Sequence, residues 1–207
     1  MKIYIKVLTI AACVYLLFVG IFNIYMNFQM YTGPIIPAIT SLYFIPVATY
    51  IIYIALSIFV LIKLLLPKRI LAHRIAGTIL AASGILQIIT LAFYFSIYHF
   101  KFKGFSMANI FQNGFLFSDY LIIIFIALLM ILIFINTFKP FVNSKISLII
   151  CAGIFTLRVA LYLIITFTAS IASLENPIHL ANAIVIILGL VLINASCIWV
   201  SYAALKK

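Results

Sequence analysis

The sequence predicts an all-α, polytopic integral membrane protein with six transmembrane helices in a compact bundle. Hydrophobic residues make up 68% of the 207 positions and charged residues only 7%, and the mean hydropathy is +1.39. A soluble domain is typically about half apolar and about a quarter charged. Because no soluble core buries that much apolar surface, lipid must be the solvent for most of the chain. Backbone polar groups in lipid need internal partners, so the spans are expected to be helices.

The first three spans are separated by short segments that favour turns. The first span follows two lysines, and its apolar run is too long for a cleavable signal sequence. Pro34 and Pro37 mark the first turn, and the tight basic segment 67–69 marks the second. Pro46 falls in the first turns of the second span. Proline costs little within the first turn of a helix but kinks the helix if it lies deeper. These signals predict spans at 6–26, 41–66 and 70–98.

The last three spans follow the longest connection, which covers 99–118. Pro140 ends the fourth span, Asn143 and Ser144 offer a cap for the fifth, and Pro177 lies in the last turn. Spans are expected at 117–138, 146–172 and 178–204. The whole chain, 1–207, is therefore predicted to be a single transmembrane domain without a soluble domain.

The distribution of basic residues predicts the orientation. If the N-terminus is cytoplasmic, one face receives ten lysines and arginines and the other face only two. The ten are Lys2, Lys6, Lys63, Lys68, Arg69, Arg74, Lys139, Lys145, Lys206 and Lys207, and the two are Lys101 and Lys103. Excess positive charge marks the cytoplasmic side, so both termini are expected there. The composition favours a bacterial source, and hence a multi-pass protein of the inner (cytoplasmic) membrane.

Arg158, near the middle of the fifth span, is the strongest candidate for a functional residue. An arginine at the membrane centre costs ~2.5–3.5 kcal/mol on insertion scales, so it must face other helices or a wet cavity. One interpretation is structural, with Arg158 bonded to Gln87 or Asn194, to helix carbonyls, or stacked on a tyrosine such as Tyr162. The other is a site for an anionic or polar ligand.

Small residues recur at helical spacing in two spans. They are Gly77, Ala81 and Gly84 in the third span, and Asn182, Gly189, Ser196 and Ala203 in the sixth. Such stripes let helices approach closely. They are expected to serve packing within the bundle, or else a contact between copies in a homo-oligomer or the lining of a pore.

Two further surfaces are expected to meet lipid or partners. The outer connection alternates cations with aromatic residues, at Lys101, Phe102, Lys103 and Phe105, which favours the headgroup region. Alternatively, the outer connection is a docking surface for an external partner or a lid over the bundle. On the inner side, Lys63, Lys68, Arg69 and Arg74 are candidates for contact with anionic lipid or an acidic cytosolic protein.

Several function classes find little support in the sequence. The three histidines and both carboxylates map near span ends and lack metal-ligand spacing, so no metal, cofactor or proton relay is expected. The three cysteines form no CxxC pair and are expected to be buried, reduced thiols. The net charge of +11 lies beside spans rather than in a basic domain, which argues against nucleic-acid binding.

The sequence therefore favours a non-enzymatic membrane subunit, anchor or sensor. Such a subunit would oligomerise and couple to a partner protein, in a role that includes bacteriocin immunity or phage defence. The alternative is a transporter or channel component that binds an anionic or polar solute at Arg158. A third hypothesis, a membrane enzyme acting on lipid, lacks an identifiable nucleophile or metal site.

Overall fold

A computed structural model describes residues 3–29, 37–99, 107–138, 142–170 and 177–206. These residues form six α-helices, each long and apolar enough to cross a membrane. The prediction of an all-helical, multi-pass membrane protein is confirmed to this extent. The helices are α1 (Ile3–Gln29), α2 (Pro37–Leu65), α3 (Ile70–His99), α4 (Met107–Phe138), α5 (Ser144–Ser170) and α6 (Pro177–Leu205).

Two helix starts differ most from the predicted spans. α4 begins at Met107, so much of the predicted long connection is helical. The segment 107–117 contains no proline and one glycine, so little in it interrupts a helix. α2 begins at Pro37, a favoured position for proline because the first N–H of a helix has no internal partner. Pro46 is therefore the tenth residue of α2, where the missing N–H removes an internal hydrogen bond.

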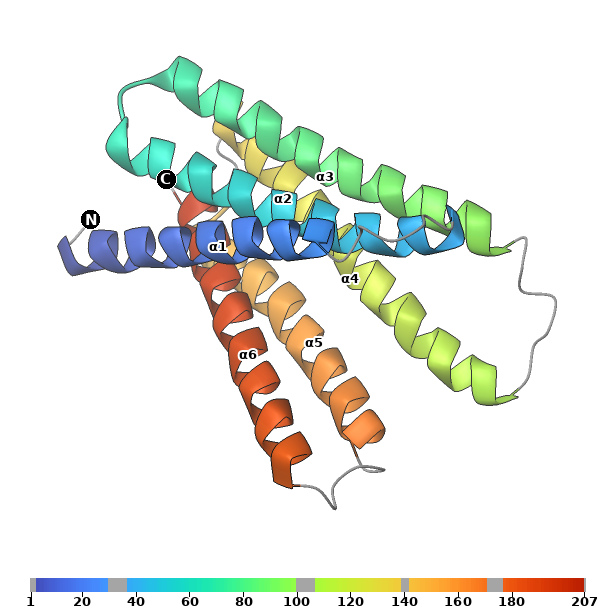
Figure 1. Cartoon of the computed structure of the whole chain (residues 1–207). Coiled ribbons are helices and arrows are strands. Elements are labelled where there is room, and N and C mark those ends of the chain that lie inside the picture. Colours follow the sequence, from blue (N-terminus) through green and yellow to red (C-terminus); the bar gives the residue numbers. More distant parts are fainter. Residues whose placement is uncertain (1–2, 30–36, 100–106, 139–141, 171–176, 207) are drawn as a thin grey trace.

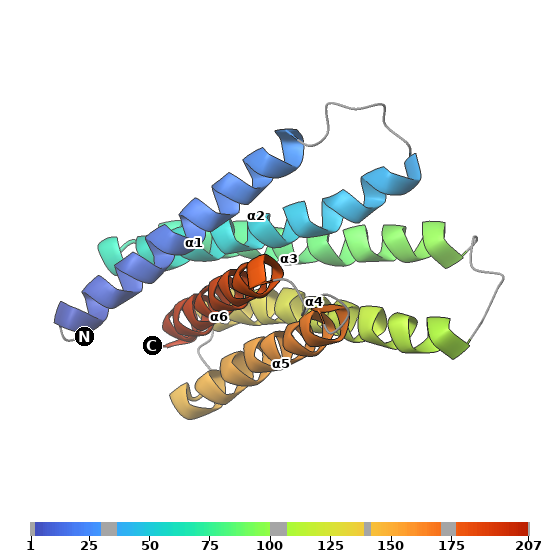
Figure 2. The same cartoon turned by 60° about the horizontal axis from the view of Figure 1, so that its bottom comes forward.

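The helices pack mainly with their neighbours in sequence. α2 lies between α1 and α3, α3 packs on α4, and α5 pairs with α6. α6 also contacts α1 and α2, and α5 contacts α4. Figures 1 and 2 show that the α5–α6 pair runs in a different direction from α3 and α4, so that the two pairs diverge away from the end that carries the C-terminus.

One apolar core connects all six helices at their region of convergence. Its largest fully buried side chains include Leu16, Ile52, Leu56, Phe59, Leu80, Met130, Ile133 and Phe155. In the apolar window of α2, 50% of residues are buried, compared with 22% in α5 and in α6. α2 is therefore the central helix, whereas most residues in the apolar windows of α5 and α6 are at least partly exposed.

Interhelical hydrogen bonds gather several helix ends at one end of the bundle. Lys63 on α2 donates to carbonyls at the end of α6, and Asn136 on α4 donates to Leu205 with a distance of 3.0 Å. Near the start of α1, Thr9 accepts a 3.0 Å bond from the indole nitrogen of Trp199 on α6. We call this region the basic end, because the described basic residues other than Arg158 belong to it. They are Lys6, Lys63, Lys68, Arg69, Arg74, Lys145 and Lys206.

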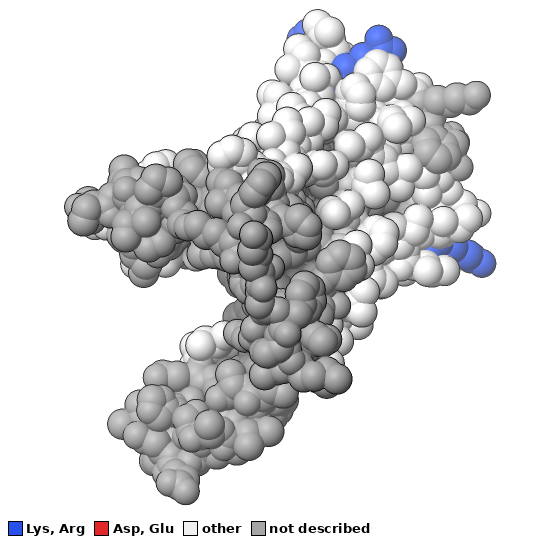
Figure 3. Space-filling model, turned by 90° about the vertical axis from the view of Figure 1, so that its right-hand side faces the viewer, with Lys and Arg blue, Asp and Glu red and all other residues white. Residues whose placement is uncertain are grey.

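In Figure 3, which views the protein from the right-hand side of Figure 1, much of the near surface lies outside the described residues. The described surface seen there is almost entirely uncharged, and lysine and arginine appear only at its edges. The predicted outer-loop residues Lys101, Phe102, Lys103 and Phe105 lie outside the described residues. The described charge of the chain is therefore concentrated at the basic end.

Candidate functional site

Arg158 lies on the face of α5 that is directed toward the core. It is the fifteenth residue of the helix, so it lies ~21 Å from the first residue and ~18 Å from the last at 1.5 Å per residue. Cys151 and Phe155 precede it on the same helical face, and both are at most 1% exposed. The helical repeat that buries these two side chains thus also directs the arginine inward, where it is partly buried.

Two tyrosines position the guanidinium. Arg158 Nη1 donates a hydrogen bond to the hydroxyl oxygen of Tyr53, which is on α2 and only 2% exposed. The guanidinium carbon lies 5.9 Å from the centre of the Tyr162 ring, one turn later on α5, which is within the range of a cation–π contact. Tyr50 packs edge-on against Tyr53, with 6.0 Å between ring centres and 72° between planes. The site therefore connects α5, a member of the α5–α6 pair, to the central helix α2.

The guanidinium has donor capacity that the described residues do not use. A guanidinium carries five N–H donors, and the Nε–H of Arg158 is buried without a hydrogen-bond partner in the described part of the chain. The side chains of the two acidic residues, Asp119 and Glu175, lie outside the described part of the structure, and no described side chain is a carboxylate. Among the described residues, the positive charge of Arg158 is therefore stabilised by the Tyr53 hydroxyl and the Tyr162 ring rather than by a counter-ion. An unused donor on a positive group is suited to a charge-assisted hydrogen bond with an anion.

The two predicted amide partners of Arg158 have other contacts. Gln87 on α3 is 1% exposed, and its amide nitrogen lies 3.0 Å from the hydroxyl oxygen of Thr49 on α2. Asn194 on α6 is also 1% exposed and donates to Leu190 of its own helix with a distance of 2.8 Å. The Oδ1 atom of Asn194 accepts no hydrogen bond from a described residue. Of the four residues proposed for this site, the structure thus brings Arg158 and Tyr162 into contact.

Sequence reasoning missed Tyr53 and Cys197. Cys197 on α6 is fully buried in the same core cluster as Tyr53. A signal for Tyr53 was present, because tyrosines in membrane helices favour the interfaces and this one is twelve residues from the end of α2. The cysteine carried no comparable signal, since a lone buried thiol is a common core residue. All three cysteines are free and buried, as predicted.

The small residues of α3 face the inside of the bundle. A Cβ atom on Gly84 would lie 2.8 Å from the carbonyl oxygen of Ala127 on α4, and one on Gly77 would lie 3.3 Å from Phe134. Ala81 is 7% exposed. This stripe therefore serves the close approach of α3 and α4 within one chain.

The stripe of α6 is less enclosed. A Cβ atom on Gly189 would meet nothing within 4 Å, and Ser196 is partly buried. Ala203 packs against the core cluster. The side chain of Asn182 lies outside the described residues. The described part of the stripe thus changes from core packing near the basic end to open space farther along α6.

The four basic residues proposed to contact lipid or a partner have different environments. Lys68 and Arg69 are exposed in the turn between α2 and α3. Arg74 is exposed and lies over the Phe138 ring, with 5.1 Å from the guanidinium carbon to the ring centre. Lys63 instead points inward, because its ammonium group bonds the carbonyls that end α6. The exposed basic surface therefore consists of the other three residues.

Comparisons with known protein families, with curated proteins and with solved structures give no match. Among the described residues, no group of three or more histidine, cysteine or acidic side chains is arranged to hold a metal ion. Function must therefore be inferred from the geometry of the Arg158 site and of the surfaces around it.

Proposed function

We propose that this chain binds a small anionic solute at Arg158 and acts as a component of a membrane transporter or channel. The observation that carries the proposal is the geometry of the guanidinium. Tyr53 and Tyr162 hold it near the middle of α5, while its buried Nε–H has no described partner. An arginine at this depth costs ~2.5–3.5 kcal/mol, and an anion at the unused donor would offset part of that cost. A structural role alone leaves that donor unexplained.

The arrangement of the helices supports a transport role for the same site. Arg158 belongs to the α5–α6 pair, which diverges from α3 and α4 away from the basic end (Figure 1). Its partner Tyr53 belongs to the central helix α2. A change in the angle between the α5–α6 pair and α2 would therefore alter the guanidinium–hydroxyl contact and the access to Arg158. We further propose that the basic end faces the cytoplasm of a bacterial inner membrane.

Anion binding is tested with the purified full-length protein in detergent. Thermal unfolding is measured with chloride, acetate and inorganic phosphate at equal ionic strength, for the wild type, Arg158→Gln and the control Arg74→Gln. We expect at least one anion to raise the unfolding temperature of the wild type and of Arg74→Gln, but not of Arg158→Gln. An anion effect that survives in Arg158→Gln contradicts the proposal. If Arg158→Gln does not fold, Arg158→Lys keeps the charge and should show a weakened response.

A second candidate function is a membrane subunit that couples to an acidic cytosolic protein. The observation that favours it is the exposure of Lys68, Arg69 and Arg74 around one turn of the basic end. Native mass spectrometry of the particle extracted from its own membranes distinguishes the two. A salt-sensitive protein partner that is lost in a Lys68→Gln/Arg69→Gln variant supports the subunit. A particle without a partner protein that carries a small anion supports the transporter.

A further inference from the structure

Two buried polar atoms on the paired helices α5 and α6 lack hydrogen-bond partners among the described residues. The Nε–H of Arg158 on α5 is a charged donor, and the Oδ1 atom of Asn194 on α6 is an acceptor. The two helices pack against each other. Buried polar atoms without partners are rare in folded proteins, because each one costs free energy unless a further group bonds it. The two atoms therefore call for a bonding partner that the described chain does not supply.

Asn194 lies at the same level of the bundle as the contact between Arg158 and Tyr53. The 2.6 Å bond from the Lys63 ammonium to the carbonyl oxygen of Ala204 brings the last turns of α2 and α6 together. Tyr53 precedes Lys63 by ten residues, and Asn194 precedes Ala204 by ten residues. Both residues therefore lie ~15 Å from this contact along helices that end at the same place. The guanidinium that bonds Tyr53 belongs to this level as well.

Asn194 belongs to the face of α6 that points into the core. Cys197 follows it by one turn on this face, and both residues are at most 1% exposed. Cys197 belongs to the same core cluster as Tyr53 and Phe155. Phe155 precedes Arg158 by one turn on the inward face of α5. The α6 face that carries Asn194 and the α5 face that carries Arg158 are therefore turned toward the same interior.

The orientation of the Asn194 amide is fixed by its own helix. The amide nitrogen donates a 2.8 Å hydrogen bond to the carbonyl oxygen of Leu190. A carbonyl oxygen only accepts, so reversing the amide would place two acceptors in contact. The unpartnered atom of Asn194 is therefore the oxygen, and any group that bonds it has to donate. A halide, or a carboxylate without a hydroxyl group, has no donor to offer.

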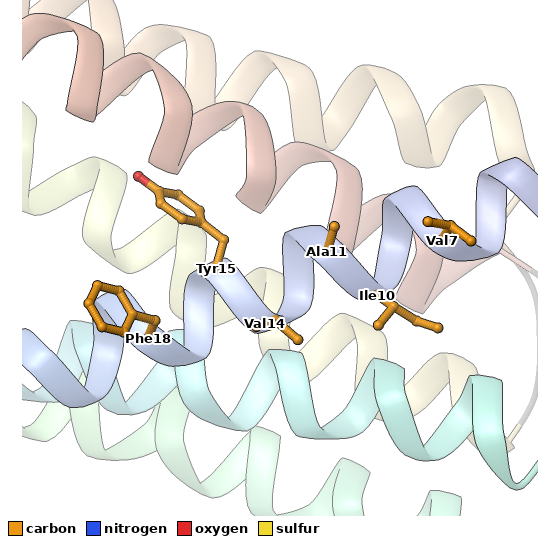
Figure 4. A pocket seen from close by; sticks show the side chains of 6 residues that line it. All are labelled: Val7, Ile10, Ala11, Val14, Tyr15 and Phe18. Carbon is orange, nitrogen blue, oxygen red and sulfur yellow. The ribbon is translucent and has the colours of Figure 1, made fainter.

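The surface hollow along α1 offers no comparable chemistry. The described side chains that line it are shown in Figure 4 and are Val7, Ile10, Ala11, Val14, Tyr15 and Phe18. None of them is charged, and all except the tyrosine are hydrocarbons. A small anion is therefore expected at the inward faces of α5 and α6 rather than on this outer face of α1.

We propose that Asn194 is a second ligand-contacting residue of the Arg158 site, and that the solute is an oxyanion with its own O–H donor. This inference rests on the anion binding proposed above and names the class of anion. The Nε–H of Arg158 donates to an anionic oxygen of the solute, and the solute hydroxyl donates to Asn194 Oδ1. An anion without a hydroxyl leaves the Asn194 oxygen unpaired, and sites with such a group discriminate against the analogue that lacks the donor.

The test compares anions of equal charge that differ in whether they carry a hydroxyl group. Thermal unfolding of the purified full-length protein in detergent is titrated with glycolate against acetate, and with monobasic phosphate against dimethyl phosphate, at equal ionic strength and mildly acidic pH. We expect a roughly two- to tenfold lower half-saturating concentration for the hydroxyl-bearing anion of at least one pair, as one added hydrogen bond provides. A preference in the first pair indicates a hydroxy-carboxylate, and one in the second pair a protonated inorganic oxyanion.

Variants of Asn194 separate this inference from the proposed function. Asn194→Leu should still bind the anion without a hydroxyl but lose the preference, whereas Arg158→Gln should bind neither anion. The control is Asn136→Leu, at a buried asparagine whose amide oxygen accepts from the backbone nitrogen of Val142, and it should keep the preference. If Asn194→Leu does not fold, Asn194→Ala should give the same result.

Two outcomes overturn the inference and leave the proposed function in place. One is equal binding of both anions of each pair by the wild type, with binding lost in Arg158→Gln. The other is a preference that survives the removal of the Asn194 amide. If no anion changes the unfolding temperature of the wild type, both the inference and the proposed function are overturned.

Discussion

The ammonium group of Lys63, in the last turn of α2, donates a 2.6 Å hydrogen bond to the carbonyl oxygen of Ala204, in the last turn of α6. The same group lies 3.3 Å from the carbonyl oxygen of Ala203 and also bonds that of Lys206. The last carbonyls of a helix have no internal partner and carry the negative end of its dipole. One lysine from a different helix therefore caps α6 and ties it to the central helix.

Replacing Lys63 by methionine is expected to destabilise the protein. Met retains an apolar stem of similar length but removes the charge and its donors. Capping of a partly buried helix end by a cation contributes up to ~2 kcal/mol, and we expect a loss of about 1–2 kcal/mol in the free energy of unfolding. Denaturant unfolding in detergent micelles measures the loss. Lys68→Met, at an exposed position of the next turn, is the control and should change stability little.

Asn136→Leu tests the second contact with the same helix end. The Asn136 amide donates to Leu205 over 3.0 Å and accepts from the backbone nitrogen of Val142 over 3.3 Å. Interhelical hydrogen bonds in membranes contribute ~0.6 kcal/mol on average and up to ~1.7 kcal/mol. We expect a loss in this range. Lys63 and Asn136 hold the same helix end. The free energy of unfolding lost in the double variant should therefore differ from the sum of the losses in the two single variants. Strict additivity would show that the two contacts act independently.

Two glycines offer a matched test of helix packing. In Gly84→Ala the new Cβ atom would lie 2.8 Å from the Ala127 carbonyl oxygen, so α3 and α4 must move apart. Overpacking of this kind typically costs ~1–3 kcal/mol. In Gly153→Ala the Cβ atom meets nothing within 4 Å, and the better helix propensity of alanine should make the change neutral or slightly stabilising. The unfolding temperature should therefore fall clearly in Gly84→Ala and stay unchanged or rise slightly in Gly153→Ala.

Tyr53→Phe tests how the arginine is positioned. The change removes the hydroxyl that accepts from Arg158 Nη1 and keeps the ring that packs against Tyr50. We expect the stability of the unliganded protein to fall by about 1 kcal/mol, because another buried donor loses its partner. Tyr50→Phe, whose ring contact is retained, should have a smaller effect. If the two variants are equally stable, the Tyr53 hydroxyl does not support Arg158.

The fold class followed from local features of the sequence. Six apolar runs of sufficient length, separated by proline, glycine and basic residues, predict helices because lipid leaves no other way to satisfy the backbone. The boundaries were less well predicted. α4 begins at Met107, inside the segment 99–118 that the sequence predicts to be a connection. Composition separates apolar from polar segments, but it does not locate the ends of a helix. A helix continues beyond the apolar run when no proline or other helix-breaking residue interrupts it.

The candidate site was predicted only in part. Arg158 is recognisable from sequence because a charge in an apolar span is costly wherever it points. Its partner Tyr53 lies 105 positions away in the chain, and no local spacing connects the two residues. Gln87, the polar residue that looked equally available, pairs with Thr49 on the interface of α2 and α3 instead. Which polar groups meet is decided by helix order and rotation, and many helix arrangements satisfy the same apolar pattern.

The sequence by itself determined that this chain enters lipid, that it does so as six helices, and that Arg158 needs a special environment. Each of these depends on the transfer of single residues or short segments out of water. Only the tertiary structure decided that α2 is central, that Lys63 turns inward to cap α6, and that Tyr53 receives Arg158. Those relationships depend on side chains far apart in the chain, and their energies arise only when the helices pack together.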